Sequence, residues 1–139
     1  MKVCIYGAGA IGGWIGSALA RAGCSVSVVA RGATLDALQL HGLRLREGER
    51  ITSQAVASSA LPADLGVQDL VVLAVKAPSL PDVARQIAPL LGPQTLVLTA
   101  MNGVPWWFLQ GFGGALAGTR LTSVDPDGTL AAALPAQRI

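Results

Sequence analysis

A glycine-rich segment near the start of the chain has the residue types and spacing that bind phosphate groups. Gly7, Gly9 and Gly12 form the pattern G-x-G-x-x-G within the sequence GAGAIGG. In such a turn the first glycine permits a tight bend, the second lets the backbone approach a pyrophosphate, and the third lets a helix pack closely on a strand. Unpaired amides at the start of the helix then face the phosphates. We therefore predict a pyrophosphate site made by Gly7, Ala8, Gly9, Ala10, Ile11 and Gly12.

The secondary-structure elements predicted on either side of this turn support its interpretation as a dinucleotide-binding fingerprint. Residues 2–6 are a short apolar run that predicts a buried strand, and residues 11–22 predict a helix that Gly23 ends. Strand, glycine turn and helix follow one another without a gap, which is the context that a dinucleotide-binding fingerprint requires. The alternative is that the glycines serve only to pack the strand against the helix.

Arg31 follows a second β-branched run, residues 25–30, at the position where NAD-specific sites usually carry an acid. An acid would bond the ribose 2′-hydroxyl and repel a 2′-phosphate. The planar, permanently charged guanidinium of an arginine suits that phosphate instead. Arg31 therefore favours NADPH/NADP as the cofactor, and the alternative is a solvated arginine in a loop.

Two polar residues end the next apolar runs. Lys76 follows residues 70–75, the most hydrophobic segment of the chain, and Asn102 follows the predicted strand 95–99. The carboxyl ends of parallel strands line one crevice, so both side chains should lie near the reactive end of the cofactor. Lys76 is one of two lysines in the chain. The alternatives are an ordinary loop lysine and, for Asn102 before Gly103, a simple turn pair.

The remaining pattern predicts an α/β fold with a doubly wound, mainly parallel sheet of the Rossmann type. Helices are expected at residues 34–40 and 81–91, and a hairpin at residues 43–46 and 51–57. Beyond Gly103 the pattern degrades, with a helical turn expected at 106–110 and a turn at 125–128. The apolar segment 130–134 has no evident helix partner.

Composition narrows the class of protein. The 139 residues suffice for one domain, 52% of them are hydrophobic, and the net charge of +2 includes no run of like charge. Nucleic acid is therefore not an expected partner, and no apolar run reaches the ~18 residues of a membrane span. Cys4 and Cys24 form no C-x-x-C pair, which fits reduced thiols in the cytoplasm. His41 lies at a predicted helix end without other ligands nearby, so no metal site is expected.

Four segments together resemble the ketopantoate reductase family, also called 2-dehydropantoate 2-reductases. They are GAGAIGG, VVARG at 28–32, VKA at 75–77 and MNGV at 101–104. The resemblance covers residues 1–125 and implies the NADP-binding N-terminal Rossmann domain of that family. It implies NADPH-dependent reduction of 2-dehydropantoate to pantoate in pantothenate and coenzyme A biosynthesis. By similarity the glycines hold the pyrophosphate, Arg31 holds the 2′-phosphate, and Lys76 and Asn102 serve the nicotinamide and the substrate as catalytic residues.

The chain also departs from the family. Met101 stands where the family often has Gln, and Pro105-Trp106-Trp107 follows soon after the Asn-Gly pair. Because of these two differences, the substrate could be 2-dehydropantoate or a related 2-keto acid or lactone. The family's proton-donating lysine belongs to a helical C-terminal domain. Residues 126–139 are then the start of the segment leading to that absent domain, and this piece alone is expected to be inactive. The alternatives are a non-catalytic NADP-binding module and a dehydrogenase-like fold for NADH or FAD. An apolar patch left exposed would favour a homodimer or an aggregate.

Overall fold

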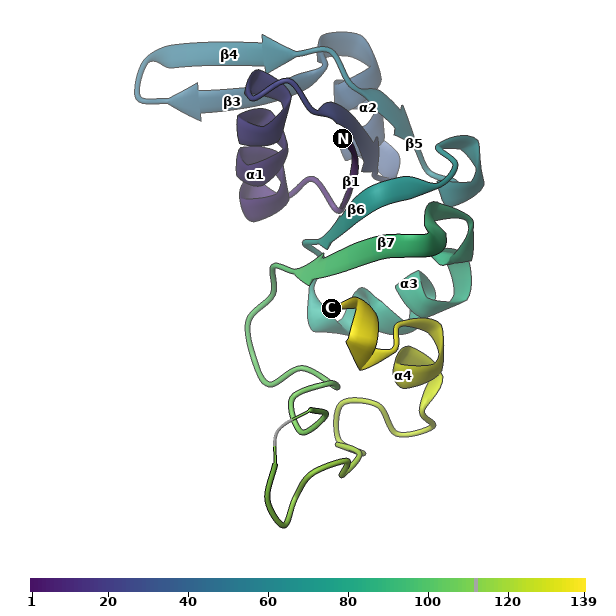
Figure 1. Ribbon diagram of the computed structural model, residues 1–139. Helices are drawn as coiled ribbons and strands as arrows, with labels where there is room; N and C mark the ends of the chain where they lie inside the picture. The colour runs from purple at the N-terminus through teal and green to yellow at the C-terminus, as the bar shows by residue number, and fades with distance from the viewer. Residues whose placement is uncertain (112) are drawn as a thin grey trace.

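The computed structural model describes residues 1–111 and 113–139 and contains a parallel sheet with the strand order β5-β2-β1-β6-β7 (Figure 1). This order reverses beside β1, as expected for a doubly wound Rossmann-type sheet. The predicted fold class is confirmed. The strands are β1 (Lys2–Tyr6), β2 (Ser25–Val29), β5 (Ala57–Ser59), β6 (Gln68–Leu73) and β7 (Leu91–Thr99).

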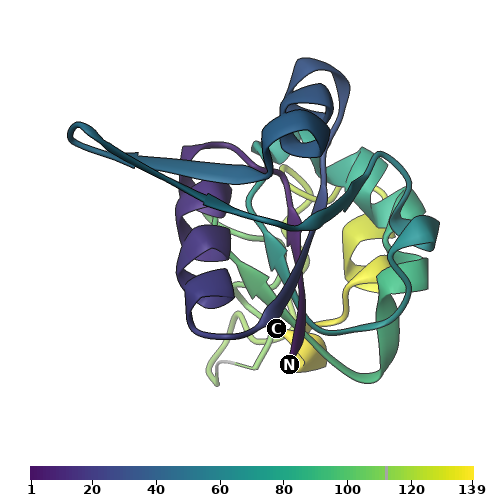
Figure 2. The ribbon, with the colours of Figure 1, turned by 90° about the horizontal axis from the view of Figure 1, so that it is seen from above.

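Helices cover both faces of the sheet. The helices α1 (Ala10–Arg21) and α2 (Gly32–His41) pack on one face, and α3 (Leu80–Gln86) and α4 (Thr129–Ala133) pack on the other (Figures 1 and 2). Alternate residues of β1 point to opposite faces because successive side chains of a strand do so. Val3 and Ile5 therefore join the core under α1, whereas Cys4 and Tyr6 join the core under α3.

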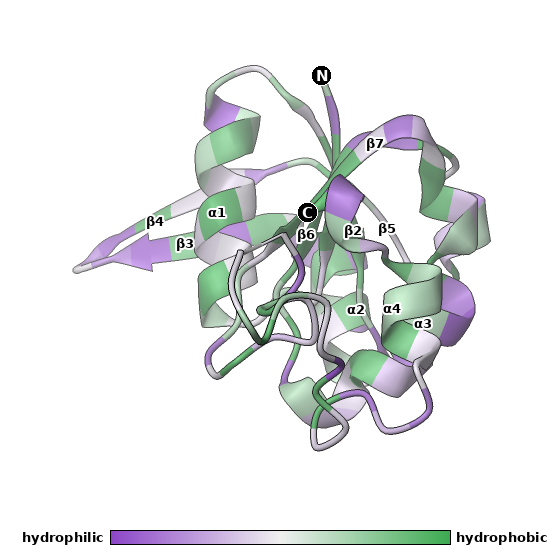
Figure 3. Cartoon of the chain, turned by 60° about the horizontal axis from the view of Figure 1, so that its bottom comes forward, coloured by the Kyte–Doolittle hydropathy of each residue, from purple (hydrophilic) through white to green (hydrophobic). Residues whose placement is uncertain are grey.

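The predicted hairpin is present, but its second strand is shorter than expected. β3 (Leu43–Glu47) pairs antiparallel with β4 (Arg50–Gln54) around Gly48, and this largely hydrophilic ribbon projects from the domain (Figures 2 and 3). Residues after Gln54 leave the hairpin, and Ala57–Ser59 form β5 beside β2 in the main sheet. The single predicted strand 51–57 was wrong because no glycine or proline marks the point where the chain changes sheet.

Prolines shorten the helix predicted at 81–91. α3 ends at Gln86, and a 3-10 turn at Ala88–Leu90 follows it. Pro89 cannot donate the backbone hydrogen bond that a continuing α-helix needs. Two further 3-10 turns, Pro62–Asp64 and Ala77–Ser79, precede β6 and α3, and a last one is Ala136–Arg138. The expected helical turn at 106–110 is a pair of hydrogen-bonded turns instead, from Phe108 to Pro105 and from Gln110 to Trp107.

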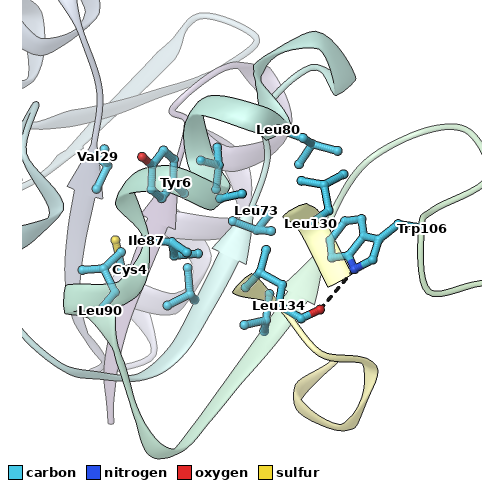
Figure 4. Packing of buried hydrophobic residues seen from close by; sticks show 14 residues of the cluster. Cys4, Tyr6, Val29, Leu73, Leu80, Ile87, Leu90, Trp106, Leu130 and Leu134 are labelled. Atoms are coloured by element: carbon cyan, nitrogen blue, oxygen red, sulfur yellow. Dashed lines mark hydrogen bonds between the residues drawn. The ribbon is translucent and has the colours of Figure 1, made fainter. Parts of the chain in front are cut away.

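The segment 130–134 does have a helix partner, contrary to the sequence prediction. Leu130 and Leu134 of the α4 region are 3% and 0% exposed and share a core with α3 and Trp106 (Figure 4). The buried carboxylate of Asp125 accepts hydrogen bonds from the amides of Leu130 and Ala131 at 2.9 and 3.1 Å. The turn residues thus fix a short helix against the sheet.

Apolar side chains remain exposed on the edge strand β7. Leu96 and Leu98 are 59% and 47% exposed. Their register partners in β6 are Leu70 and Val72, which belong to the core on the α1 side of the sheet. Two apolar side chains that lie two residues apart in β7 are thus exposed at this edge of the sheet. None of the helices in the described part of the chain has the length and apolar character that crossing a bilayer requires.

Burial of Cys4 in β1 predicts a loss of stability in alkali. Burial raises the pKa of this thiol from 9.0 to about 11, and burial also raises the pKa of Tyr6 on the same strand. Because the folded-state pKa lies above the unfolded value, the stabilisation is complete below about pH 9 and disappears as the pH rises toward about 11. At roughly 1.4 kcal/mol per pKa unit, Cys4 alone accounts for about 2 to 3 kcal/mol.

Urea unfolding at a series of pH values between about 8 and 11 measures this loss. The Cys4→Ala variant should show a shallower decline than the parent chain, whereas Cys24→Ala should decline as the parent does. Cys24 is a suitable control because its thiol is free and only half-buried. Identical declines in both variants would exclude the Cys4 thiol as the source.

Candidate nucleotide-binding site

The glycine turn has the geometry that its spacing predicted. Gly7 has a φ of +98°, and a Cβ at this position would lie 2.9 Å from the carbonyl oxygen of Ala74. A Cβ on Gly12 would lie 2.0 Å from the carbonyl oxygen of Gly7 and 3.1 Å from Ile5 Cγ2. These two positions accept no side chain without moving the backbone. The first glycine thus forms the turn, and the third brings α1 onto β1.

Gly9 differs from the other two because it faces open space. Apart from its own atoms and its chain neighbours, Gly9 has no atom of the described residues within 4 Å of the position that its Cβ would occupy. Gly9 is also the residue before the first turn of α1, where no side chain caps the helix and no acidic residue is present. The backbone at this helix start is therefore open to an anion, as a pyrophosphate site requires.

A crevice of about 460 Å³ joins this turn to the ends of β6 and β7. Its lining includes Gly9, Ala10 and Ile11 on one side, and Lys76 and Asn102 on the other. Lys76 lies in the loop after β6 and Asn102 in the loop after β7, and both residues are exposed. The structure thus brings together five of the predicted site residues. Ala8 instead is half-buried and packs against the core under α1.

Arg31 borders a second, smaller hollow. This cavity of about 170 Å³ is lined by Gly7, Arg31 and Ser79, among others, and shares Val75 with the larger crevice. The two hollows therefore lie on either side of the glycine turn and meet at the end of β6. Arg31 lies at the end of β2, as predicted, and immediately precedes α2, which begins at Gly32 instead of the expected residue 34.

The guanidinium of Arg31 already has a partner. Its Nη1 lies 3.7 Å from Asp82 Oδ2, and Arg85 hydrogen-bonds to the other oxygen of the same carboxylate. All three side chains are about half exposed, which limits the strength of these ion pairs. Sequence reasoning missed Asp82. The spacing of Asp82 and Arg85 indicates a helical pair, but only the fold brings Arg31 to them.

The Tyr6 hydroxyl is a further polar group of the smaller hollow. Its oxygen is buried and lies near the Arg31 guanidinium, which is the group in the described part of the chain that interacts with it. Burial raises the pKa of this phenol, and the nearby positive charge of Arg31 opposes the rise. The group is therefore a neutral hydroxyl at physiological pH.

The single histidine and the acidic and thiol side chains were the remaining candidates for a metal site. His41 is the last residue of α2 and is exposed. The residues that the structure describes contain no cluster of three or more His, Cys, Asp and Glu side chains that could hold a metal ion.

Comparison with protein families and curated proteins gives a consistent result. The family model described as ketopantoate reductase PanE/ApbA matches residues 3–105. A 2-dehydropantoate 2-reductase of Mesorhizobium japonicum is 51% identical over 140 positions, which cover this whole chain and 43% of that protein. A 2-dehydropantoate 2-reductase of Pyrococcus horikoshii is 31% identical over 75% of this chain and 34% of its own length. The chain thus spans less than half the length of these relatives.

Solved structures agree with the sequence comparison. A candidate ketopantoate reductase from Ralstonia solanacearum superimposes with a TM-score of 0.93 at 53% identity, covering 98% of this chain and 42% of that one. A D-mandelate dehydrogenase, solved with NADH and anilino(oxo)acetate, has a TM-score of 0.68 at 28% identity over 75% of this chain and 34% of its own. On the family match and the shared fold, the chain belongs to the ketopantoate reductase PanE/ApbA family.

Proposed function

We propose that this chain is the NADPH-binding part of a reductase that converts a 2-keto acid or a related lactone into the corresponding hydroxy compound. Reduction of 2-dehydropantoate to pantoate, in the formation of pantothenate and coenzyme A, is the reaction that the names of its relatives indicate. The observation that carries the proposal is the crevice joining the glycine turn to Lys76 and Asn102. Ligands of doubly wound proteins bind at this edge of the sheet.

The residues of the turn fit a dinucleotide. Gly9 leaves open the space that a Cβ would fill, and the uncapped start of α1 offers amides to a pyrophosphate. The segment from Gly7 to Gly12 would hold this group, and Arg31 would hold the 2′-phosphate. When bound, the reduced nicotinamide supplies the hydride that a ketone accepts.

Lys76 and Asn102 are the proposed catalytic residues of this part of the enzyme. Reduction of a ketone places negative charge on its oxygen, and a positioned cation or hydrogen-bond donor stabilises that charge. The ammonium of Lys76 and the side-chain amide of Asn102 border the same crevice and can supply both. The proton donor of the family belongs to a further domain, so we expect no turnover from these 139 residues alone.

The same proposal includes a domain boundary, a cellular compartment and an oligomeric state. We assign the nucleotide-binding unit to residues 1–125 and a lead toward a further domain to residues 126–139, although α4 of the latter segment packs in the core of the former. The free thiols of Cys4 and Cys24 suit the cytoplasm. The exposed Leu96 and Leu98 support a homodimer.

Arg31 decides the choice of coenzyme. The mandelate dehydrogenase with this fold was solved with NADH, so the fold alone does not fix the choice. The half-exposed Asp82 holds Arg31 only weakly, since exposed ion pairs contribute about 0 to 1 kcal/mol. The guanidinium can therefore exchange this carboxylate for a phosphate dianion.

The Arg31→Ala change tests this assignment. We expect the NADPH affinity of the chain to fall by about tenfold or more, equivalent to ~1.4 kcal/mol, while the NADH affinity stays nearly constant. Calorimetric titrations with both nucleotides at one salt concentration measure the difference. Arg46→Ala, in the exposed β3 strand, is the control for the loss of one positive charge. Equal losses for NADPH and NADH in Arg31→Ala would contradict the phosphate role.

A further inference from the structure

We propose that an apolar cavity beside Asn102 receives the side chain of the substrate, and that the preferred substrates are 2-keto acids with a bulky apolar, above all aromatic, side chain. The inference rests on the proposed function, because it places the keto-acid group at Lys76 and Asn102. It adds the class of side chain that the site selects.

The cavity adjoins the nucleotide crevice. It measures about 410 Å³ and lies between the loop after β7, the start of α3 and Val124. Ala77, Met101 and Asn102 line both hollows, so the surface runs from the glycine turn past Asn102 into the cavity. The volume lies within the range of about 300 to 1,000 Å³ that small-molecule pockets show.

The lining favours an apolar group with a ring. Three consecutive aromatic residues, Trp106, Trp107 and Phe108, contribute to it, together with Leu80, Met101 and Val104. No charged side chain of the described residues lines this cavity, whereas Lys76 lines the crevice on the other side of Asn102. A carboxylate is costly to bury without a partner. The carboxylate end of a keto acid therefore belongs at Lys76 and its side chain in the cavity.

Two indole groups define the wall further. The Trp106 N–H donates to the carbonyl oxygen of Leu134 at 3.1 Å, which fixes this ring against α4 (Figure 4). The Trp107 Nε1 is buried and has no hydrogen-bond partner in the part of the chain that the structure describes. Because this nitrogen has almost no accessible surface, the Trp107 side chain contributes apolar ring atoms to the cavity wall and not a hydrogen-bond donor.

The test measures binding without turnover. The 139-residue chain is first titrated with NADP⁺ and then, when saturated, with phenylpyruvate and with pyruvate in a calorimeter. The two acids share the keto-acid group and differ by a phenyl ring. We expect phenylpyruvate to bind about tenfold tighter or more, because its phenyl ring moves from water into the apolar cavity. Oxidised nucleotide carries no hydride to transfer, so the heat reports binding alone.

A matched pair of variants locates the ring. Val104 lines the cavity and Val67 lies outside it, and both are 56% exposed, so an aspartate at either position should be tolerated by the fold. Val104→Asp should weaken phenylpyruvate binding about fivefold or more and leave pyruvate within about twofold. Val67→Asp should change neither.

The outcomes separate the two proposals. Failure to bind NADP⁺ or NADPH would overturn the proposed function itself. Normal nucleotide binding with equal affinity for both acids, or with no detectable binding of either acid, would overturn only the side-chain assignment. An effect of Val104→Asp that is the same for both acids would also overturn it.

Discussion

Replacing Gly12 by alanine should abolish nucleotide binding and destabilise the domain by about 3 kcal/mol or more. The added Cβ would lie 2.0 Å from the carbonyl oxygen of Gly7 and 2.9 Å from Ala74 Cβ. Neither neighbour is the flexible end of a side chain, so α1 must move away from β1. That movement displaces the backbone of the glycine turn. Urea unfolding and NADPH titration of the same sample measure both effects.

Gly13→Ala is the control from the same helix. The nearest atom to its Cβ position is Leu43 Cδ1 at 4.0 Å, an ordinary contact. Alanine has a higher helix propensity than glycine by about 1 kcal/mol, so this variant should be as stable as the parent or slightly more stable. Nucleotide binding should be retained. If Gly12→Ala behaved like Gly13→Ala, the close packing of α1 on β1 would not be what forms the site.

The Trp106→Ala variant should lose about 3 to 5 kcal/mol of stability. Trp106 is 3% exposed, packs in the core between α3 and α4, and donates its hydrogen bond to Leu134 (Figure 4). Truncation leaves a cavity and an unpaired carbonyl. Because the free energy of unfolding of a domain is typically only about 5 to 15 kcal/mol, a substantial fraction of the variant would be unfolded at physiological temperature.

Trp14→Ala serves as the comparison for Trp106→Ala. Trp14 lies on α1 and is 57% exposed, and surface substitutions usually change stability by about 0.5 kcal/mol or less. Far-ultraviolet circular dichroism in urea is the appropriate measurement, because it does not depend on the tryptophans that are removed. A small effect at Trp106 would show that the loop after β7 and α4 do not share one core.

The glycine turn could be predicted from the sequence because most of its causes are local. The positive φ of Gly7, the open space beside Gly9 and the close approach of Gly12 to the Gly7 carbonyl oxygen arise within a few residues, although Gly7 and Gly12 also pack against Ala74. The positions of Arg31, Lys76 and Asn102 followed from one further rule, that parallel strands end at the same edge of a sheet. The structure places all three as that rule requires.

The missed features depend on contacts between distant segments. The break between β4 and β5 is decided by pairing of Ala57 with Ser27 in the main sheet. The burial of Leu134 depends on α3 and Trp106, and the ion pair of Arg31 depends on the position of Asp82 after β6. The polar turn at residues 125–128 and the apolar segment at 130–134 do not by themselves indicate which distant residues they contact. Local patterns therefore predicted the strands and the glycine turn better than the packing of residues 125–139.

The contact of α1 with β1 through Gly12 and Gly16 has a consequence for the coenzyme exchange that the proposed function implies. A Cβ on Gly16 would lie 2.9 Å from Leu43 and 3.0 Å from Ile5, so the helix is held along two of its turns before any ligand arrives. A binding site whose backbone is already held in its bound conformation loses little conformational entropy when a ligand binds. The free and bound chains should therefore share one backbone in this turn. Differences in residence time among nucleotides then arise at the exposed side chains around it, of which Arg31 and Asn102 are the foremost.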